Sequence, residues 1–131
     1  MGPEEALRLL SRVPLGRIVF TRHALPEIRP VNHIVDAGDV VIRTHDGAAL
    51  TRRARDAGVR GVVVAYEADD IDTVTRLGWS VMVTGYCRLV TDPQEAARYR
   101  AVLRPWTDRP TDHVVRIRPD LITGIRLVPA R

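Results

Sequence analysis

The chain has 131 residues and a mass of 14.6 kDa, which is the size of one ordinary domain. Hydrophobic residues make up 45% and charged residues 27% of the sequence, and this balance excludes disordered and collagen-like chains. All 20 basic residues are arginine, and the one cysteine is Cys87. These counts exclude an intrachain disulfide, a zinc site built from several thiolates, and covalent chemistry that needs a lysine amine.

The sequence shows no sign of membrane insertion or export. Its longest apolar run, at residues 62–66, is far shorter than the roughly 18 residues that a membrane span needs. The segment Met1–Glu5 is acidic and lacks the basic and apolar regions of a signal peptide. We therefore expect a cytoplasmic protein with no membrane partner. The net charge of +4 is weak evidence for nucleic-acid binding, because the high pKa of arginine explains much of the pI near 10.2.

The first part of the chain predicts a short helix and then strands. The helix is expected over residues 4–12, where apolar side chains recur at helical spacing. Strands are expected over 17–21 and 26–35, where β-branched residues and alternation dominate. The segment Asp36-Ala-Gly-Asp39 has the composition of a tight turn and should join the second strand to a partner over 40–44.

The middle of the chain predicts a second helix between buried strands. Residues 46–57 place Leu50, Ala54 and Ala57 on one helix face, with Asp46 as the N-cap. A strand is expected over 61–67, followed by a polar loop over 68–78. The longest strand is expected over 79–90, and one of its faces is apolar. The residues of that face are Trp79, Val81, Val83, Cys87 and Leu89.

The last part predicts a third helix and the strands that complete the sheet. Asp92-Pro-Gln-Glu95 combines an N-cap, a proline at the first helical position and a capping-box glutamate. Ala96, Tyr99 and Leu103 form the apolar stripe of this helix. Strands follow over 113–118 and 121–128. Six or seven mostly antiparallel strands with three short helices predict a mainly β protein, a small barrel with flanking helices, formed by a single domain over residues 1–131.

Most polar residues do not form a catalytic pattern. The four histidines, which lack metal-ligand spacing, are His23, His33, His45 and His113. The aspartates 69, 70 and 72 lack the rest of a calcium loop and are interpreted as a solvated loop that caps a turn. Ser11 and Ser80 lack the context of a nucleophile elbow. Cys87 is expected to face inward as an inert thiol.

Residues 43–50 form a candidate anion site. The segment Arg43-Thr-His-Asp-Gly-Ala-Ala-Leu50 leads from a predicted strand into a predicted helix. Free backbone N–H groups at a helix start attract anions, and Arg43, Arg52 and Arg53 would add bidentate contacts to a phosphate. The alternative is an ordinary turn in which Asp46 caps the helix, and its carboxylate would repel a phosphate.

Several segments between Gly16 and Leu127 share their order and spacing with a known family. They are Gly16-Arg-Ile-Val-Phe20, Arg29-Pro-Val-Asn-His33, Gly38-Asp-Val-Val-Ile-Arg-Thr44, Asp69-Asp-Ile-Asp72, Arg76-Leu-Gly-Trp-Ser-Val81 with Gly85, and Ile117-Arg-Pro with Ile122-Thr-Gly-Ile-Arg-Leu127. On these segments the chain resembles the pyridoxamine 5′-phosphate oxidase-like family of FMN-binding split β-barrels, most closely its nitroimidazole-reductase-like branch.

The resemblance implies a homodimer with two FMN sites at the subunit interface. By similarity, the residues along the isoalloxazine ring would be Arg29, Pro30, Val31, Asn32, Ile42, Arg43 and Thr44. The phosphate would be held by His45, Gly47, Ala48, Ala49, Leu50 and Arg53. Trp79 and Ser80, contributed by the partner chain, would complete the pocket, and Trp79 would anchor the interface.

This chain departs from the family pattern in the phosphate turn. Relatives commonly have Gly-Ser-Lys where this chain has Gly47-Ala48-Ala49, so that a hydroxyl and an ammonium group are missing. Each charge-assisted hydrogen bond contributes about 1.5–3 kcal/mol. We expect Arg43, Arg52 or Arg53 to compensate for the loss.

The function that the resemblance implies is FMN-dependent oxidation or reduction of a small molecule, with the hydride chemistry supplied by the cofactor. The alternatives are a deazaflavin-dependent reductase, haem in the same barrel, and a non-catalytic flavin- or ligand-binding sensor with a degraded flavin site, which the Ala48-Ala49 departure favours. A nucleic-acid-binding barrel is disfavoured, because the chain has only two Trp, three Tyr and one Phe and no stacking pair on a strand. The residues themselves assign no general acid or base.

Overall fold

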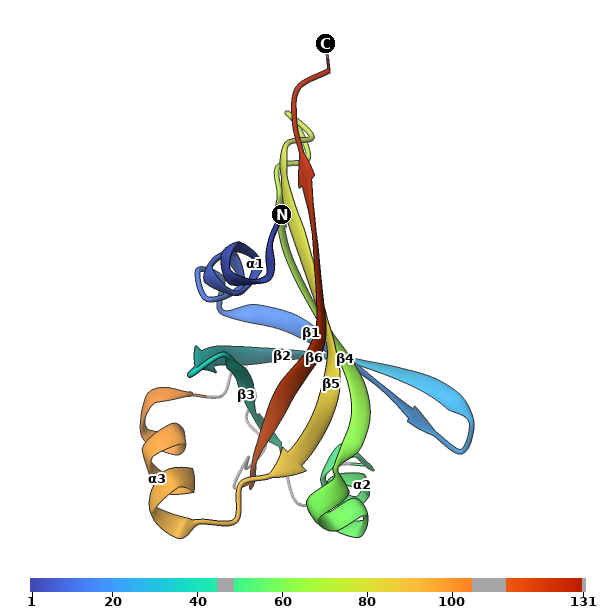
Figure 1. Cartoon of the computed structure of the whole chain (residues 1–131), viewed down its shortest axis with the longest axis vertical. Coiled ribbons are helices and arrows are strands. Elements are labelled where there is room, and N and C mark those ends of the chain that lie inside the picture. Colours follow the sequence, from blue (N-terminus) through green and yellow to red (C-terminus); the bar gives the residue numbers. More distant parts are fainter. Residues whose placement is uncertain (45–48, 105–112, 131) are drawn as a thin grey trace.

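The computed structural model describes residues 1–44, 49–104 and 113–130. Its elements, in chain order, are α1 (Pro3–Leu10), β1 (Leu15–Arg22), β2 (Leu25–Asp36), β3 (Asp39–Thr44), α2 (Ala49–Ala57), the 3-10 turn η1 (Gly58–Arg60), β4 (Val62–Ile71), β5 (Gly78–Leu89), α3 (Pro93–Val102) and β6 (His113–Leu127). The six strands close into a barrel in the order β1-β2-β3-β6-β5-β4 (Figure 1). The prediction of a mainly β barrel with three short helices is confirmed.

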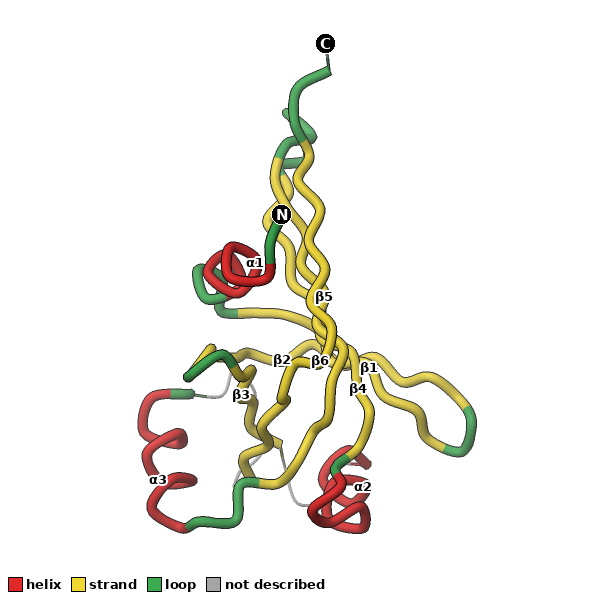
Figure 2. The backbone as a smooth tube through the Cα atoms, in the orientation of Figure 1, coloured by secondary structure: helices red, strands yellow, loops and turns green. Residues whose placement is uncertain are grey.

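Two parts of the sheet extend beyond the closed barrel. Strand β1 pairs with β4 only over Arg17–Val19, so the rest of the β1–β2 hairpin projects to one side (Figure 2). Strands β4, β5 and β6 continue past the barrel as a three-stranded ribbon, where Trp79 lies between Asp70 and Arg126. Helix α1 packs against β5 and β6, and the ion pair between Arg126 and Glu5 ties the helix to the ribbon.

The apolar faces predicted from the sequence meet in two cores. Side chains from all six strands, α1 and α2 fill the larger core, which includes Leu50 and Ala54 of α2 and the buried face of β5. The smaller core lies under α3, where Ala96, Tyr99 and Leu103 pack against β3 and β6. The predicted stripes of both helices are therefore confirmed.

Two predicted breaks in the sheet are wrong. The segment 68–78 was expected to be a loop, but β4 continues to Ile71 because Asp69 and Asp70 pair with β5. The strands expected over 113–118 and 121–128 are one strand, β6. Its register against β5 shifts between Thr84 and Gly85, which leaves Asp120 as the extra residue of a bulge. A bulge admits a proline inside a strand, which explains why Pro119 does not end β6.

Candidate functional site

The strand residues expected along a flavin ring lie on β2 and β3, which are neighbours in the barrel. Arg29 and Pro30 are exposed, whereas Val31 and Asn32 are half-buried. The Asn32 amide donates to the carbonyl of Arg104 at 2.5 Å. The Arg43 guanidinium donates to the carbonyls of Leu103 at 3.1 Å and Arg100 at 3.3 Å. Two of the predicted ring residues thus hold the C-terminal end of α3.

The junction between β3 and α2 is held from inside the molecule. The Thr44 hydroxyl hydrogen-bonds the Thr51 hydroxyl at 2.6 Å, and both side chains are buried. Leu50 and Ile42 are also buried in the larger core, so their side chains face inward. Ala49 is half-buried. Three predicted phosphate-turn residues, His45, Gly47 and Ala48, lie outside the described residues.

A cavity of about 310 Å³ opens beside the start of α2. Its lining residues are Arg22, His23, Ala49, Arg52, Arg53 and Asp56, and we call it the arginine cavity. Arg53 donates a hydrogen bond to the carbonyl of Thr21, which fixes α2 against the projecting β1–β2 hairpin. The cavity therefore brings Arg52, Arg53 and Ala49 together with the tip of that hairpin.

Arg22 and His23 were missed by the sequence analysis as possible ligand contacts. Arg22 pairs with Leu25 across the hairpin, so His23 and Ala24 form a two-residue turn, and both have positive φ. Such hairpin turns require left-handed backbone at both central residues. His23-Ala24 lacks the Asn-Gly signature that marks this turn in a sequence. The sequence therefore predicts neither the hairpin turn nor the approach of Arg22 to α2.

Trp79 and Ser80 lie at the beginning of β5, in the extended ribbon, whereas α2 packs near the other end of that strand (Figure 1). One chain therefore does not bring them to the arginine cavity. Trp79 is only 8% exposed and belongs to the larger core of its own chain. The indole is thus largely covered by its own chain, and its expected role at a subunit interface stays a prediction. Ser80 is half-buried on the opposite strand face.

A model of the pyridoxamine 5′-phosphate oxidase family matches residues 2–126. The chain belongs to this family. It is 53% identical over 125 residues to the uncharacterized protein Rv0080 of Mycobacterium tuberculosis, covering 95% of this chain and 82% of that one. It is also similar to the structure of the FAD binding protein from Mycobacterium smegmatis, with a TM-score of 0.76, 36% identity and coverage of 96% and 95%.

The same fold occurs in a crystal structure from Bacteroides thetaiotaomicron assigned as a 5-nitroimidazole antibiotic resistance protein. That likeness has a TM-score of 0.71 and 13% identity, and covers 92% of this chain and 81% of the other. The family resemblance read from the sequence is confirmed by the family model and by the M. smegmatis relative. Among the described residues of this family member, helices long and apolar enough to cross a membrane are absent, and so are groups of three or more potential metal-binding side chains.

A buried polar pair joins β2, the strand expected along the flavin ring, to β4. It consists of His33 of β2 and Tyr66 of β4. His33 Nε2 lies 2.9 Å from the carbonyl of Leu10, and a carbonyl only accepts, so Nε2 carries the proton. Nδ1 therefore accepts from the Tyr66 hydroxyl at 2.5 Å. Burial lowers the pKa of His33 and raises the pKa of Tyr66, so both groups stay neutral and tie β2 to β4 and α1.

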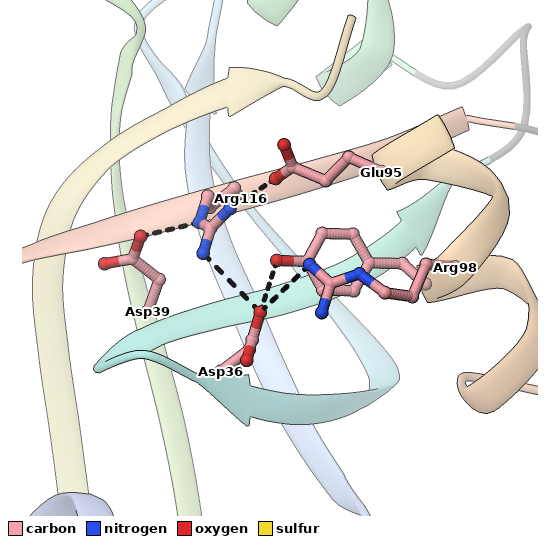
Figure 3. Close-up of polar contacts among 6 residues, drawn as sticks. Asp36, Asp39, Glu95, Arg98 and Arg116 are labelled. Atoms are coloured by element: carbon pink, nitrogen blue, oxygen red, sulfur yellow. Dashed lines mark hydrogen bonds and ion pairs between the residues drawn. The ribbon is translucent and has the colours of Figure 1, made fainter. Parts of the chain in front are cut away.

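A second polar group ties α3 to the barrel through Arg116 of β6 (Figure 3). Arg116 Nε lies 2.6 Å from Asp39, its Nη1 contacts Glu95, and its Nη2 is 3.7 Å from Asp36. The Tyr99 hydroxyl donates to Asp36 at 2.5 Å. We call these side chains the Arg116 cluster. Its charges are satisfied within the chain, so the cluster has a structural role.

Two further residues singled out in the sequence have structural roles in the chain. Burial raises the pKa of the Cys87 thiol to about 12, which keeps it protonated and unreactive. Asp72 accepts hydrogen bonds from the backbone of Val74 and Thr75, and these bonds lower the pKa of its carboxyl. Asp72 therefore caps the turn between β4 and β5, as predicted, whereas Asp69 and Asp70 of the same acidic segment lie in β4.

Proposed function

We propose that the protein is an FMN-binding oxidoreductase that acts on a small molecule, and that the arginine cavity receives the phosphate of the flavin. The observation that carries the proposal is the donor set of that cavity. The described lining residues of the cavity include three arginines, Arg22, Arg52 and Arg53, and one carboxylate, Asp56. Guanidinium groups bind phosphate oxygens through paired N–H donors, so this set fits a phosphate monoester.

The proposal also assigns the compensation for the missing lysine and serine of the phosphate turn. Arg43 donates to the carbonyls at the end of α3 and is not among the described residues that line the cavity. Arg52 and Arg53 are exposed and line it. Arg53 uses a donor on the carbonyl of Thr21, and a guanidinium has five N–H donors. The compensating charge therefore belongs to α2. The M. smegmatis relative, which is an FAD binding protein and 36% identical, supports a flavin as the ligand.

The ring would lie along the exposed part of β2, at Arg29 and Pro30, on the strand that leads away from the hairpin tip. A bound flavin supplies hydride chemistry. The chain's own part is to orient and shield the ring. Asn32 and Arg43 hold α3 beside β2, and the neutral pair His33 and Tyr66 fixes the strand from inside.

We also propose that two chains associate through the outer face of the sheet, so that Ser80 of one chain approaches the flavin of the other. Directly paired residues across five strands form one outward row, which consists of Ile28, Val19, Ala65, Thr84 and Leu121. Ile28 is 58% exposed and Leu121 57% exposed. Four of the five residues in this row are apolar, and exposed apolar residues grouped on one face are typical of a subunit interface.

The test of the flavin site is a fluorescence titration with FMN and riboflavin, which share the ring and differ in the phosphate. We expect FMN to bind more tightly, and the double variant Arg52→Met, Arg53→Met to lose at least about tenfold in FMN affinity with riboflavin affinity unchanged. The matched control is Arg12→Met, which changes an exposed arginine two residues after the end of α1. Equal affinities for both ligands in the parent protein would contradict the site.

FAD is titrated alongside, because a relative binds it; a clear preference for FAD would replace FMN in the proposal. The sensor alternative rests on the Ala48-Ala49 departure. It is tested by adding a nicotinamide reductant to the flavin-loaded protein and following the flavin absorbance. Bleaching at a rate above that of free flavin supports an oxidoreductase, and bleaching no faster than free flavin supports the sensor.

The test of the interface is light scattering of the variant Leu121→Asp against the parent. We expect the parent to scatter as twice 14.6 kDa and the variant as one chain, because a buried unpaired carboxylate disfavours association. The control is Val102→Asp, which changes an equally exposed residue of α3. A monomeric parent, or a dimer that survives Leu121→Asp, would contradict this interface.

A further inference from the structure

Arg88 of β5 has a buried donor that the described part of the chain leaves without an acceptor. Its Nε is inaccessible to solvent and makes no hydrogen bond to any described residue. Its Nη2 makes one long contact, 3.5 Å to the carbonyl of Arg60. Buried donors in native proteins are almost always paired, so this guanidinium is under-satisfied on the edge that carries Nε and Nη2.

The backbone beside Arg88 explains its position. Gly61 has a φ of +80°, and a Cβ at that position would lie 2.9 Å from Cγ of Arg88. The absence of a side chain at Gly61 lets the aliphatic stem of Arg88 pack across the backbone between η1 and β4. The guanidinium is thereby held at the wall of two hollows, both of which are also lined by residues of η1.

The first hollow has a volume of about 480 Å³ and is lined by Arg60, Tyr86 and Arg88. The second, of about 470 Å³, is lined by Arg88 together with residues of α2, η1, the end of β5 and the segment after it, including Arg55 and Thr91. Among the described lining residues of both hollows, none carries a carboxylate. Both are therefore basic, and hydroxyl groups accompany the arginines.

The surroundings of Arg88 differ from those of the arginine opposite it on the neighbouring strand, β6. Arg116 lies directly opposite Arg88 in the β5–β6 register, and it is surrounded by Asp36, Asp39 and Glu95. Arg118 lies directly opposite Tyr86 and adds a further positive charge on the same strand face. Asp36, Asp39 and Glu95 thus pair with Arg116, and the side chain directly opposite Tyr86 is positively charged.

We propose that Arg60, Tyr86 and Arg88 form a binding site for a small oxyanion of the phosphate class. Two guanidinium groups and a phenol are donors that match the oxygens of a tetrahedral anion. An acceptor in the first hollow would draw the Arg88 edge toward it, supply the partner that Nε lacks and replace the long contact of Nη2. The site shares no residue with the arginine cavity, so it is independent of the proposed flavin phosphate.

The experiment is a titration of the ¹⁵N-labelled full-length protein with inorganic phosphate, with sodium chloride added to hold ionic strength constant. The observable is the Nε–H signal of Arg88, identified by its loss in Arg88→Met, a variant that keeps the aliphatic stem. We expect a saturable shift of this signal. Phosphate affinity, measured calorimetrically, should fall at least about tenfold in Arg88→Met and Arg60→Met and less than about twofold in Arg12→Met.

Tyr86→Phe and Arg60→Met keep the test valid if Arg88→Met fails to fold. The titration is repeated in the double variant Arg52→Met, Arg53→Met, which lacks the arginine-cavity cations but keeps the Arg88 site. A saturable shift that persists there supports the proposal. The proposal is overturned if phosphate produces no saturable shift, if the shift disappears in that double variant, or if Arg12→Met weakens binding as much as Arg60→Met does.

Discussion

The arginine cavity and the Arg116 cluster are both rich in arginine, but their charge balance is opposite. In the Arg116 cluster, one guanidinium faces Asp36, Asp39 and Glu95, and the carboxylates consume its hydrogen-bonding capacity (Figure 3). In the arginine cavity, three guanidinium groups line a space with one acidic side chain, Asp56, among its described residues. The difference separates arginines that hold the fold together from arginines placed to receive an anion.

The largest effect that this comparison predicts comes from removing the guanidinium of Arg116. In Arg116→Met, Asp36, Asp39 and Glu95 lose their common counterion and repel one another. We expect the free energy of unfolding in urea to fall by about 2–3 kcal/mol, less than for a fully buried pair because the side chains are partly solvated. The control is Arg98→Met, whose guanidinium is mostly exposed and 3.6 Å from Asp36. It should cost less than about 1 kcal/mol. Equal losses in the two variants would contradict the assignment of a central role to Arg116.

The second prediction sharpens the comparison within the candidate flavin site. Arg43→Met removes the donor for the carbonyls of Arg100 and Leu103, so we expect a loss of stability of about 1–2 kcal/mol and no change in the ratio of FMN to riboflavin affinity. Arg53→Met should do the reverse: the ratio falls severalfold, and stability falls by only about 0.5 kcal/mol, because the lost hydrogen bond to the Thr21 carbonyl is exposed. Urea denaturation and ligand titration of both variants provide the measurements. A lower FMN-to-riboflavin ratio in Arg43→Met would return Arg43 to the phosphate site.

Local signals explain the parts of the fold that the sequence predicts well. The turn at Asp36–Asp39 and the cap at Asp92 depend on a few neighbouring residues. In the structure Ala37 and Gly38 have the positive φ that a tight hairpin turn needs, and the Asp92 carboxylate accepts from the N–H of Gln94. The buried face of β5 follows from simple alternation. Each of these features is decided within about ten residues of chain.

The parts that the sequence does not predict depend on contacts between distant segments. Asp69 and Asp70 are poor strand formers, and only their pairing with β5 keeps them in β4. The approach of Arg22 to α2 depends on how far the β1–β2 hairpin projects beyond β4. The family pattern places Trp79 at a subunit interface, but it does not indicate that the indole also packs into the larger core of its own chain. Sequence spacing identifies candidate residues, whereas the tertiary fold decides which of them face a ligand.

The smallest predicted effect concerns pH and the buried pair His33 and Tyr66, which contrasts with both arginine sites because it is uncharged. Burial lowers the pKa of His33 below its ordinary value of 6.5. Below that pH the unfolded chain binds a proton that the folded chain does not, so stability present above about pH 6.5 is lost as the pH falls toward the folded pKa.

The free energy of unfolding should therefore decline between pH 7.5 and 5.5, with a contribution from His33 of at most about 1.4 kcal/mol per pH unit. His33→Gln retains a side-chain N–H donor for the Leu10 carbonyl but does not titrate, so we expect a shallower slope in this variant, whatever its absolute stability. His23→Asn is the matched control. His23 is exposed at the tip of the β1–β2 hairpin with a φ of 52°, a conformation that asparagine tolerates. Its removal should leave the slope of the parent unchanged.

If His33→Gln shows the same dependence of unfolding free energy on pH as the parent, the folded chain accepts the proton at His33 without cost. The Tyr66 hydroxyl would then have to turn from Nδ1 toward the carbonyl of Val31, 3.2 Å away, and accept the new proton's hydrogen bond from the ring.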